Sequence, residues 1–592
     1  MGVAAAPSVE RSSCGTVPFA RALIRGSLIR SLSKIAVGGL DATRDASGIL
    51  PGRTVFVRTF ARVALGLFLA MGFAASGAQG QAAVRNGPAA APSSRDTRAA
   101  LRKLVELPQT TATTPLRAAL QTFYAQRSFS PVWSGSEAAR AHAASVRAAL
   151  GNAAAQGLNP RNYTAALARW KASPPKAGGD AASFDFAVTS SLFRYASDLQ
   201  TGRVKPKDVY RHVALPPNEL DPAKALADAL AHDDLDGFLA DLPPVHPGYK
   251  YLVAALARYR AIAAKGGWPI VPGGIALDGS DPRIAVLAKR LAFEDPVLTA
   301  NAKPSADAVR DALLRFEKRT GLPEDGKLGP DVLRMLNAPA AWRVKQIEAN
   351  MERWRWMPRY LEQRYIEVDV PDQSVSYIDG GKALLYSRVV IGKPSTPTPI
   401  LRTTVAAVIA NPPWDVPSDI AARKLLPKLR SKPDYLLVKN MVLSDGPAND
   451  PHGIRINWRH VSASNLRYQI QQSPGADNAL GTILFDMPNE FDVYLHDTPE
   501  KNLFALDVRE KSNGCVRVQE ISELASLLLE GDDSDSAAQL QPAIASGQTQ
   551  HIALSSPVAV YMLYWTAVAE ADGTVHFRFD RYGRDRLLVA KL

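Results

Sequence analysis

The hydrophobic periodicity of the chain changes near residue 362, and this change constrains the fold more than any other feature of the sequence. From about residue 101 to 265 apolar residues recur at helical spacing, as in SVRAALGNAAAQGL (145–158). From about 362 they alternate, as in YIEVDVPDQSVSYIDGGKALLYSRVVIG (365–392). A chain of 592 residues is also too long for a single domain, because domains usually contain roughly 100–200 residues. The sequence therefore predicts a multidomain α+β protein.

Residues 1–82 have the features of an export leader. Arg53, Arg58 and Arg62 precede an apolar run of 13 residues, Val63–Ala75, and small residues follow it. This order is typical of a secretory signal peptide. An uncleaved membrane anchor remains an alternative, although the run is short for a bilayer span. The segment before Arg53 is unusual for a signal, and indicates either a start site placed too far upstream or a long basic region.

The rest of the chain divides by composition and period. Residues 83–100 are rich in Ala, Pro and Ser and are expected to form a linker. Residues 101–282 are expected to form an α-helical scaffold domain, in which Phe186, Leu192, Phe193 and Leu199 recur near helical spacing. A small unit is expected at 283–340 and a β-rich domain at 362–592.

The unit at 283–340 contains a compact helical pattern. Val309, Leu313 and Phe316 mark one helix face, and Gly321 stands where that helix should end. Asp325-Gly326 is a turn signal, and Leu333 and Leu336 belong to a second short helix. The unit resembles a three-helix peptidoglycan-binding module at Phe316, Gly321, Leu322, Asp325, Gly326 and Gly329, with Glu317 and Val332 in place of Gln and Thr. These matches mostly concern the fold, so binding by this copy stays open.

The β-rich domain is expected to begin with strand, turn and strand, with Asp379-Gly380-Gly381 as the hairpin turn. Further strands are expected in TTVAAVIANPPW (403–414), GTILFDM (481–487), FDVYLHDT (491–498) and the C-terminal segment. A Lys-rich, helical insert occupies about 418–480. It is too long for a simple loop, so we expect a cap or subdomain with its own structure.

Charge and composition exclude some functions. The formal net charge is +13, but nine basic and three acidic residues lie within 1–82, which leaves a mild charge of +7 on the rest. That charge suits an anionic polymer such as cell wall. No dense basic run with interleaved aromatic residues is present, so nucleic acid is not an expected partner. His452 and His460 do not form a convincing metal-ligand pattern, and we expect no metal or organic cofactor.

The segment VYLHDTPEKNLFALDVREKSNGCVRV (493–518) carries the chemistry. The chain has two cysteines, and Cys14 lies in the expected leader, which leaves Cys515 in the exported part. His496 ends a predicted strand 19 residues earlier. A thiol with a pKa near 8.5 becomes a good nucleophile when an imidazole within reach takes its proton. Gly514 permits a turn that other residues would not adopt. The N–H groups of Gly514 and Cys515 are candidates for an oxyanion hole. Arg517 is a candidate for holding a carboxylate of the substrate.

This segment resembles the active-site signature of L,D-transpeptidases with a YkuD-type domain, and in particular the large Gram-negative periplasmic YcbB-like members. The matching residues are Tyr494, Leu495, His496, Asp497, Thr498, Pro499, Lys501, Leu503, Phe504, Arg509, Ser512, Gly514, Cys515, Arg517 and Val518. Many members have a second His beside the Gly, where this chain has Asn513. His496 must therefore be the base, oriented by a backbone carbonyl near Asp497 or by Asp497 itself.

The resemblance implies a periplasmic enzyme that acts on peptidoglycan stem peptides. Cys515 would form a thioester with the diaminopimelate carbonyl of a tetrapeptide donor and release D-Ala, and the amine of another diaminopimelate would complete a 3→3 cross-link. Carbapenem-type β-lactams would be covalent inhibitors. Tyr494, Arg509, Ser512, Asn513 and Arg517 are expected to contact substrate. Trp414, in the segment NPPWDVP (411–417), is expected either to line the substrate groove or the cap hinge, or only to pack beside the rigid prolines. The segment GKPSTPTPI (392–400) is expected to have a mainly structural role.

Other interpretations remain. A wall-binding scaffold with a vestigial site would lack catalysis, but the intact set of His496, Gly514, Cys515 and Arg517 disfavours it. A cysteine protease shares the Cys–His pair, yet His before Cys does not suit the papain-like order. Relatives with the same residues attach proteins to the wall, exchange the terminal D-amino acid or hydrolyse, so the sequence does not fix the acceptor. It does not fix the oligomeric state either.

Overall fold

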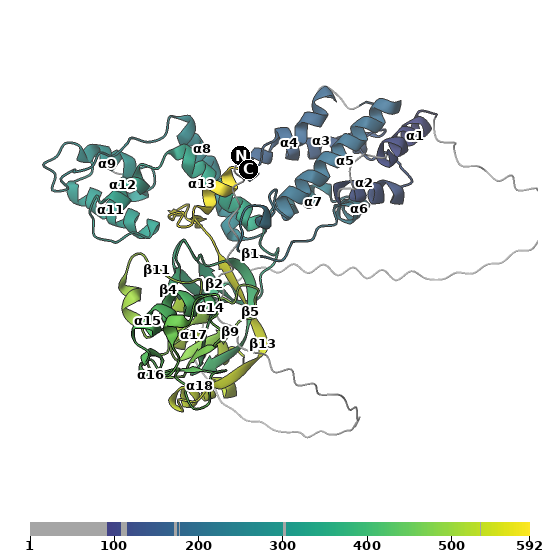
Figure 1. Ribbon diagram of the computed structural model, residues 1–592. Helices are drawn as coiled ribbons and strands as arrows, with labels where there is room; N and C mark the ends of the chain where they lie inside the picture. Colours follow the sequence, from purple (N-terminus) through teal and green to yellow (C-terminus); the bar gives the residue numbers. More distant parts are fainter. Residues whose placement is uncertain (1–91, 108–114, 171–174, 177, 300–302, 533) are drawn as a thin grey trace, which may run out of the picture. The chain divides into compact units, whose positions relative to one another are not determined.

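The structure is a computed structural model that describes residues 92–592, apart from 108–114, 171–174, 177, 300–302 and 533 (Figure 1). The expected leader lies outside the described residues. The expected linker 83–100 is wrong over its second part, because helix α1 begins at Pro92 and packs against α5. None of the helices in the described ranges is long and apolar enough to cross a membrane.

The first helical region is organised around one apolar core. Its members include Phe193 and Leu199, which the sequence pattern placed on a helix. The buried carboxylate of Asp185 accepts hydrogen bonds from the backbone N–H of Val132 (2.8 Å) and Trp133 (2.7 Å). The helices are α1 (Pro92–Glu106), α2 (Pro115–Gln126), α3 (Glu137–Gly151), η1 (Ala153–Gln156), α4 (Arg161–Thr164), η2 (Ala165–Trp170), α5 (Gly178–Gln200), η3 (Pro206–Asp208), α6 (Pro222–Ala231) and α7 (Leu235–Asp241).

The second helical region shows why the small unit folds as predicted. Val309, Leu313 and Phe316 are buried, and Gly321 ends their helix with φ 69°, a left-handed conformation that favours glycine. Glu317 Oε2 accepts the N–H of Gly326 at 2.9 Å and so holds the predicted turn. The helices are α8 (Pro247–Ala264), α9 (Ile284–Leu291), α10 (Pro296–Thr299), α11 (Ala306–Thr320), α12 (Pro330–Leu336) and α13 (Ala340–Arg355).

The cores do not follow the expected boundaries at 282 and 362. Leu252 and Leu256 of α8 share one core with Leu313 of the small unit and with Val575 and Phe577 near the C-terminus. Strand β1 (Val213–Ala214), within the expected scaffold, pairs with β5 of the main sheet. These long-range contacts leave no periodic signal, so composition could not reveal them.

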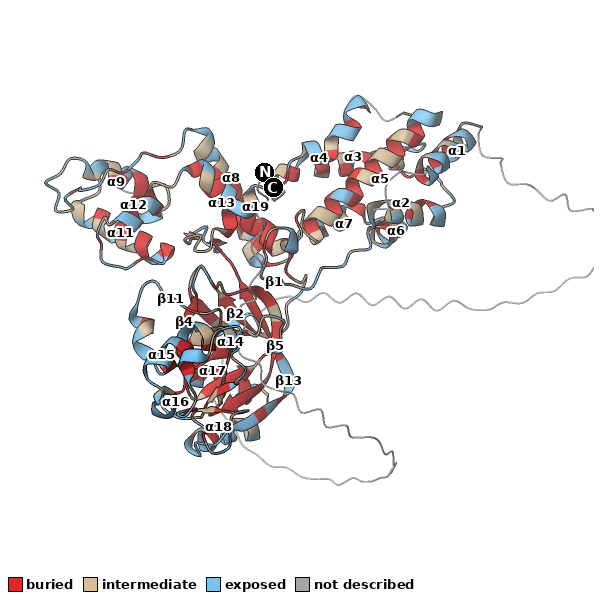
Figure 2. Cartoon of the chain, in the orientation of Figure 1, coloured by how far each residue is buried: buried red, intermediate tan, exposed pale blue. Residues whose placement is uncertain are grey.

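The β-rich domain is a sheet that closes on itself. Its hydrogen-bonded order runs β5-β13-β2-β3-β4-β12-β10-β9, and β9 pairs again with β5, with β1 and β11 attached. Figure 2 shows buried residues concentrated on these strands. The strands are β2 (Arg364–Asp369), β3 (Ser374–Asp379), β4 (Lys382–Gly392), β5 (Ile400–Ala410), β9 (Ile483–Asp486), β10 (Leu495–His496), β11 (Glu510–Ser512), β12 (Val516–Val518) and β13 (Gln550–Leu563).

The start of this domain contains two hairpin turns. The Gly380-Gly381 turn joins β3 to β4 as expected, but the preceding segment forms two strands, because a tight turn with Gln373 at φ 56° separates β2 from β3.

Helices α17 (Ile521–Glu530) and α18 (Ser534–Ala545) pack on the sheet core. Strands β14 (Ala567–Ala569) and β15 (Val575–Phe577) form a hairpin, and α19 (Arg584–Val589) packs against α13.

The insert has a core of its own around Trp458, but the expectation of a helical insert is wrong in part. It contains a three-stranded sheet of order β6-β8-β7, whose strands of three residues are too short to show alternation in sequence. Its elements are β6 (Trp414–Val416), α14 (Ser418–Ile420), the π-helix η4 (Ala421–Leu425), α15 (Leu426–Ser431), α16 (Tyr435–Val438), β7 (Met441–Leu443), η5 (Trp458–His460) and β8 (Ile470–Gln472).

Candidate active site

Strands β10 and β12 are parallel neighbours; His496, the predicted base, ends β10, and Cys515, the predicted nucleophile, immediately precedes β12. Leu495 pairs with Val516 and His496 with Arg517, while the N–H of Val516 donates to the carbonyl of Tyr494 at 2.9 Å. Side chains alternate between the two faces of a strand. One face enters the sheet core, to which Val493, Leu495, Val516 and Val518 belong. By this alternation His496, Cys515 and Arg517 share the opposite face.

The turn before Cys515 is fastened by the side chain of Ser512. Its Oγ donates to the carbonyl of Cys515 at 2.6 Å and accepts the N–H of Gly514 at 3.1 Å. Gly514 has φ 128°, a conformation that residues with a Cβ rarely adopt. Cys515 itself is 3% exposed, and its Sγ lies 3.9 Å from the carbonyl oxygen of Asp492. The N–H of Gly514 is thus engaged within the turn, so the expectation that it serves an oxyanion hole is not met in this conformation. Ser512 positions the turn rather than facing substrate.

The loop after β4 holds the same turn from its other side. Thr398 Oγ1 accepts the N–H of Gly392 at 2.9 Å and donates to the carbonyl of Gly514 at 2.8 Å. The N–H of Lys393 donates to the carbonyl of Ser512 at 3.1 Å. These contacts give the segment 392–400 the structural role that the sequence predicted for it.

The imidazole of His496 is buried and has a defined tautomer. Its Nδ1 lies 2.5 Å from the carbonyl oxygen of Asp497, and because a carbonyl only accepts, Nδ1 carries the hydrogen. Burial, followed by the positive charge of Arg517, lowers the pKa of His496 to about 4. At neutral pH the ring is therefore uncharged, with Nε2 able to accept a proton.

The carboxylate of Asp497 does not orient His496. It accepts hydrogen bonds from the backbone N–H of Thr482 at 3.0 Å and from the hydroxyl of Thr482 at 3.1 Å, and it forms an ion pair with Lys501. Of the two orienting groups considered from sequence, the structure shows contact by the backbone carbonyl alone. The Asp497 side chain instead fixes the segment that leads into β9.

Two arginines of the signature differ in their surroundings. Arg517 is paired with Glu500 and its side chain is 18% exposed, so it can reach a ligand. The guanidinium of Arg509 is buried against three backbone carbonyls, those of Val389 (3.0 Å), Leu506 (2.8 Å) and Gln373 (3.0 Å). The expectation that Arg509 contacts substrate is therefore wrong, because its donors are used to join β4 to the loop before β11.

Tyr494 and Trp414 lie in one small apolar cluster with Ile409, Leu480 and Leu484. Trp414 also packs against the core of the insert. It therefore occupies the junction between the insert and the sheet, which agrees with a place at the cap hinge. Burial, with Asp492 and Asp486 nearby, raises the pKa of Tyr494 to about 12, so its hydroxyl remains protonated at neutral pH.

Lys424 is a residue of the site that the sequence did not single out. It belongs to the π-helix η4 of the insert, and its Nζ lies 3.4 Å from Oδ1 of Asn513. Partial burial and the charges of Lys393 and Arg517 lower the pKa of Lys424. π-Helical turns are rare and often occur at functional sites. The only available signal was the Lys-rich composition of the insert, because 89 residues separate Lys424 from Asn513.

Comparison with known proteins assigns two parts of the chain. Residues 118–256 match the family described as a scaffold domain, and residues 363–540 match the family described as the L,D-transpeptidase catalytic domain. Residues 363–540 form an L,D-transpeptidase catalytic domain. Its β-rich fold with a preceding helical scaffold agrees with the α+β architecture predicted from periodicity.

A curated relative supports the assignment over part of the chain. A protein named "Putative L,D-transpeptidase" from Haemophilus influenzae is 33% identical over 243 residues, which are 41% of this chain and 48% of the relative. This chain thus spans about half the length of the curated relative that it matches.

Solved L,D-transpeptidases match more weakly. A mutant enzyme from Enterococcus faecium is 12% identical, with 38% of this chain and 65% of that chain covered and a TM-score of 0.18. The L,D-transpeptidase from Xylanimonas cellulosilytica is 14% identical, with 50% of this chain and 98% of that chain covered and a TM-score of 0.18. Such TM-scores are too low to support a detailed comparison of structures.

Proposed function

We propose that this chain is an exported peptidoglycan L,D-transpeptidase that forms 3→3 cross-links through a thioester on Cys515. The observation that supports this most directly is that His496 ends β10 and Cys515 immediately precedes the parallel neighbour β12, within residues that match an L,D-transpeptidase catalytic domain. The apolar run Val63–Ala75 behind three arginines supports export to the periplasm.

Acylation would begin with the neutral imidazole of His496. Nε2 takes the proton of the Cys515 thiol while Sγ attacks the carbonyl carbon of diaminopimelate in a tetrapeptide donor. The tetrahedral intermediate then breaks the amide C–N bond, and the imidazolium returns its proton to the departing amine of D-Ala. The lowered pKa of His496 favours this return, because the protonated ring is a strong acid in its buried site.

The second half of the reaction transfers the acyl group. The side-chain amine of another diaminopimelate attacks the thioester carbonyl while His496 accepts a proton from that amine. The C–S bond then breaks, and the imidazolium returns the proton to the departing thiolate, which restores the thiol and the neutral ring. Arg517 would hold a substrate carboxylate, because a guanidinium pairs well with carboxylates and part of this one is accessible. No step requires a metal or an organic cofactor.

The insert would act as a cap over the thioester. Lys424 of the insert contacts Asn513, two residues before Cys515, and Trp414 packs at the junction of insert and sheet. A cap that covers the acyl-enzyme limits the access of water until an amine acceptor arrives.

Covalent labelling tests the nucleophile. The purified chain is incubated with a carbapenem, and the intact mass is measured for the natural protein, for Cys515→Ala and for Cys14→Ala. We expect one adduct in the natural protein and in Cys14→Ala, and none in Cys515→Ala. Failure of the natural protein to form an adduct would favour a wall-binding scaffold with an inactive site.

Analysis of the wall tests the product. Peptidoglycan from cells with the natural protein and with Cys515→Ala is digested and separated. We expect 3→3 dimers only with the natural protein. Equal amounts of 3→3 dimers in both would contradict the proposed product, and a protein-linked or D-amino-acid-exchanged product would replace it with another acceptor.

A further inference from the structure

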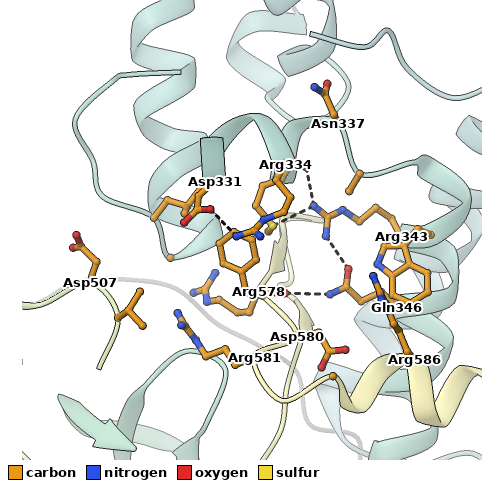
Figure 3. Close-up of a pocket in the computed structure, with 18 of the residues that line it drawn as sticks. Asp331, Arg334, Asn337, Arg343, Gln346, Asp507, Arg578, Asp580, Arg581 and Arg586 are labelled. Atoms are coloured by element: carbon orange, nitrogen blue, oxygen red, sulfur yellow. Dashed lines mark hydrogen bonds and ion pairs between the residues drawn. The ribbon is translucent and has the colours of Figure 1, made fainter. Parts of the chain in front are cut away.

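A pocket of about 1000 Å³ lies outside the catalytic turn (Figure 3). Its walls come from the small helical unit and α13 (321–323 and 331–346), from the segment before β11 (507–510) and from the C-terminal segment (578–586). Ligand pockets usually measure roughly 300–1,000 Å³, so this volume admits a ligand of several rings.

Two aromatic side chains line the pocket. Trp342 of α13 and Phe579 of the C-terminal segment are half-buried, so part of each ring remains open to the pocket. The indole N–H of Trp342 makes no hydrogen bond to any residue that the structure describes. Flat aromatic faces with a polar edge suit sugar rings, whose C–H faces are apolar and whose hydroxyl edges form hydrogen bonds.

Arginines from three segments surround the same space, as Figure 3 shows for Arg334, Arg578 and Arg581. Arg334 lies 4.6 Å from the ring centre of Phe579 and forms an ion pair with Asp331. Arg581 donates to Glu510 at 2.8 Å and to the carbonyl of Pro371 at 2.9 Å, and its side chain is only 9% exposed, so it belongs to the wall of the pocket. A guanidinium has five N–H donors, so the single ion pair of Arg334, whose side chain is 65% exposed, leaves donors for a ligand carboxylate.

The remaining charged groups divide into fixed and accessible ones. Arg343 and Arg578 hold backbone carbonyls, those of Met335 and Arg319, and so serve the walls. Arg586 is exposed and has no ion pair within the described residues. The lining also contains the carboxylate of Asp507. Accessible groups of both signs suit a ligand that carries carboxylates and an amine as well as sugar.

The pocket is connected to the catalytic turn through the chain. Glu510 is the first residue of β11, and Ser512, which fastens the turn at Cys515, is the last. A polymer held in the pocket would therefore lie beside the strand that leads into the catalytic turn.

We propose that this pocket binds a glycopeptide segment of peptidoglycan, with its sugar rings on Trp342 and Phe579 and its carboxylates on Arg334 and Arg586. The choice of polymer rests on the proposed function. The pocket would hold the wall while the catalytic turn acts on a stem peptide, so small sugar-free donors would not need it.

Binding is measured with the full chain acylated at Cys515 by a carbapenem, so that the catalytic site is filled. The probe is the disaccharide-tetrapeptide monomer from digested wall, titrated by calorimetry. The test variant is Arg334→Glu with Arg586→Glu. The matched control is Lys318→Glu with Lys591→Glu. It also replaces two positive charges by two negative ones, but at exposed positions outside the pocket lining. Thermal unfolding of each variant verifies folding, and Arg586→Gln alone replaces the test variant if that unfolds early.

We expect at least tenfold weaker binding in the test variant and a change below twofold in the control, while turnover of a sugar-free tetrapeptide stays within twofold in both. No binding by the natural chain, or equal affinity in the natural chain and the test variant, would overturn the pocket assignment. Absence of carbapenem acylation would instead overturn the proposed function, and the same titration on the unmodified chain would then still test the pocket.

Discussion

The Nδ1 atom of His496 donates to the backbone carbonyl of Asp497 across 2.5 Å, and this bond sets the chemistry of the site. It assigns the hydrogen to Nδ1 and leaves Nε2 as an acceptor. A backbone carbonyl does not titrate, so it accepts this hydrogen bond at every pH, whereas a carboxylate in its place could be protonated. The site therefore differs from triads in which a buried carboxylate orients the ring, and its pH response depends mainly on His496 and on Arg517 beside it.

Replacing Arg517 with Gln should move the acid limb of acylation to higher pH. Acylation needs the neutral imidazole, and burial together with the Arg517 charge lowers the pKa of His496 to about 4. Without that charge the pKa rises toward its ordinary value of about 6.5, so activity is lost at a higher pH than in the natural protein. The rate constant for carbapenem acylation, measured from pH 3.5 to 8, locates the limb.

Glu500→Gln is the matched control for this prediction, because it removes the ion-pair partner of Arg517 and leaves the positive charge. Its acid limb should stay in place or move to lower pH. An acid limb at the same pH in Arg517→Gln and in the natural protein would show that Arg517 does not set the protonation of His496.

Thr398→Val should weaken the catalytic turn. The Thr398 hydroxyl joins the N–H of Gly392 to the carbonyl of Gly514, and its loss leaves a buried donor unpaired at a cost of about 1–3 kcal/mol. We expect acylation about tenfold slower or more, with Tm lowered by a few degrees. Thr396→Val is the control, since its hydroxyl contacts Ser512 at a longer 3.3 Å. Equal rates in the two variants would argue against a specific role for Thr398.

The sequence predicted those parts of the fold that repeat a local pattern. β4 and β5 extend over 11 residues each, long enough for alternation to be visible, and the helix that ends at Gly321 shows both a periodic face and a stop. Strand β10 contains only Leu495 and His496, so a motif rather than a period placed the imidazole at a strand end.

The missed features depend on contacts between distant residues. Thr398 lies 116 residues from Gly514, and Lys424 lies 89 from Asn513, so no spacing could link them. Arg509 belongs to the signature, but a motif does not show whether a guanidinium faces substrate or backbone carbonyls. The sequence thus singled out His496 and Cys515 as candidates, and it could not identify the groups that position them.

The buried ion pair between Arg353 and Asp585 should be important for stability. Nη1 and Oδ1 are 2.7 Å apart, both side chains are almost fully buried, and Thr566 donates to the same Oδ1 at 2.9 Å. Asp585→Ala leaves Arg353 buried without its partner, which we expect to cost about 3–5 kcal/mol. Urea unfolding measures the loss. Glu106→Ala, at the exposed pair with Arg102, should cost about 1 kcal/mol or less, and a similar loss in both variants would contradict the expectation.

The contact between Lys424 and Asn513 allows a test of the cap without deletion of the insert. Lys424→Met removes the hydrogen bond that joins the π-helix of the insert to the turn at Cys515. If the insert shields the thioester, this loss should raise the ratio of hydrolysis to cross-linking about threefold or more. Product analysis with a tetrapeptide donor and a fixed amine acceptor gives the ratio. Lys428→Met is the matched control, because Lys428 contacts Tyr435 within the insert and no residue of the turn. An unchanged ratio in Lys424→Met, with cross-linking intact, would show that this contact does not govern the access of water.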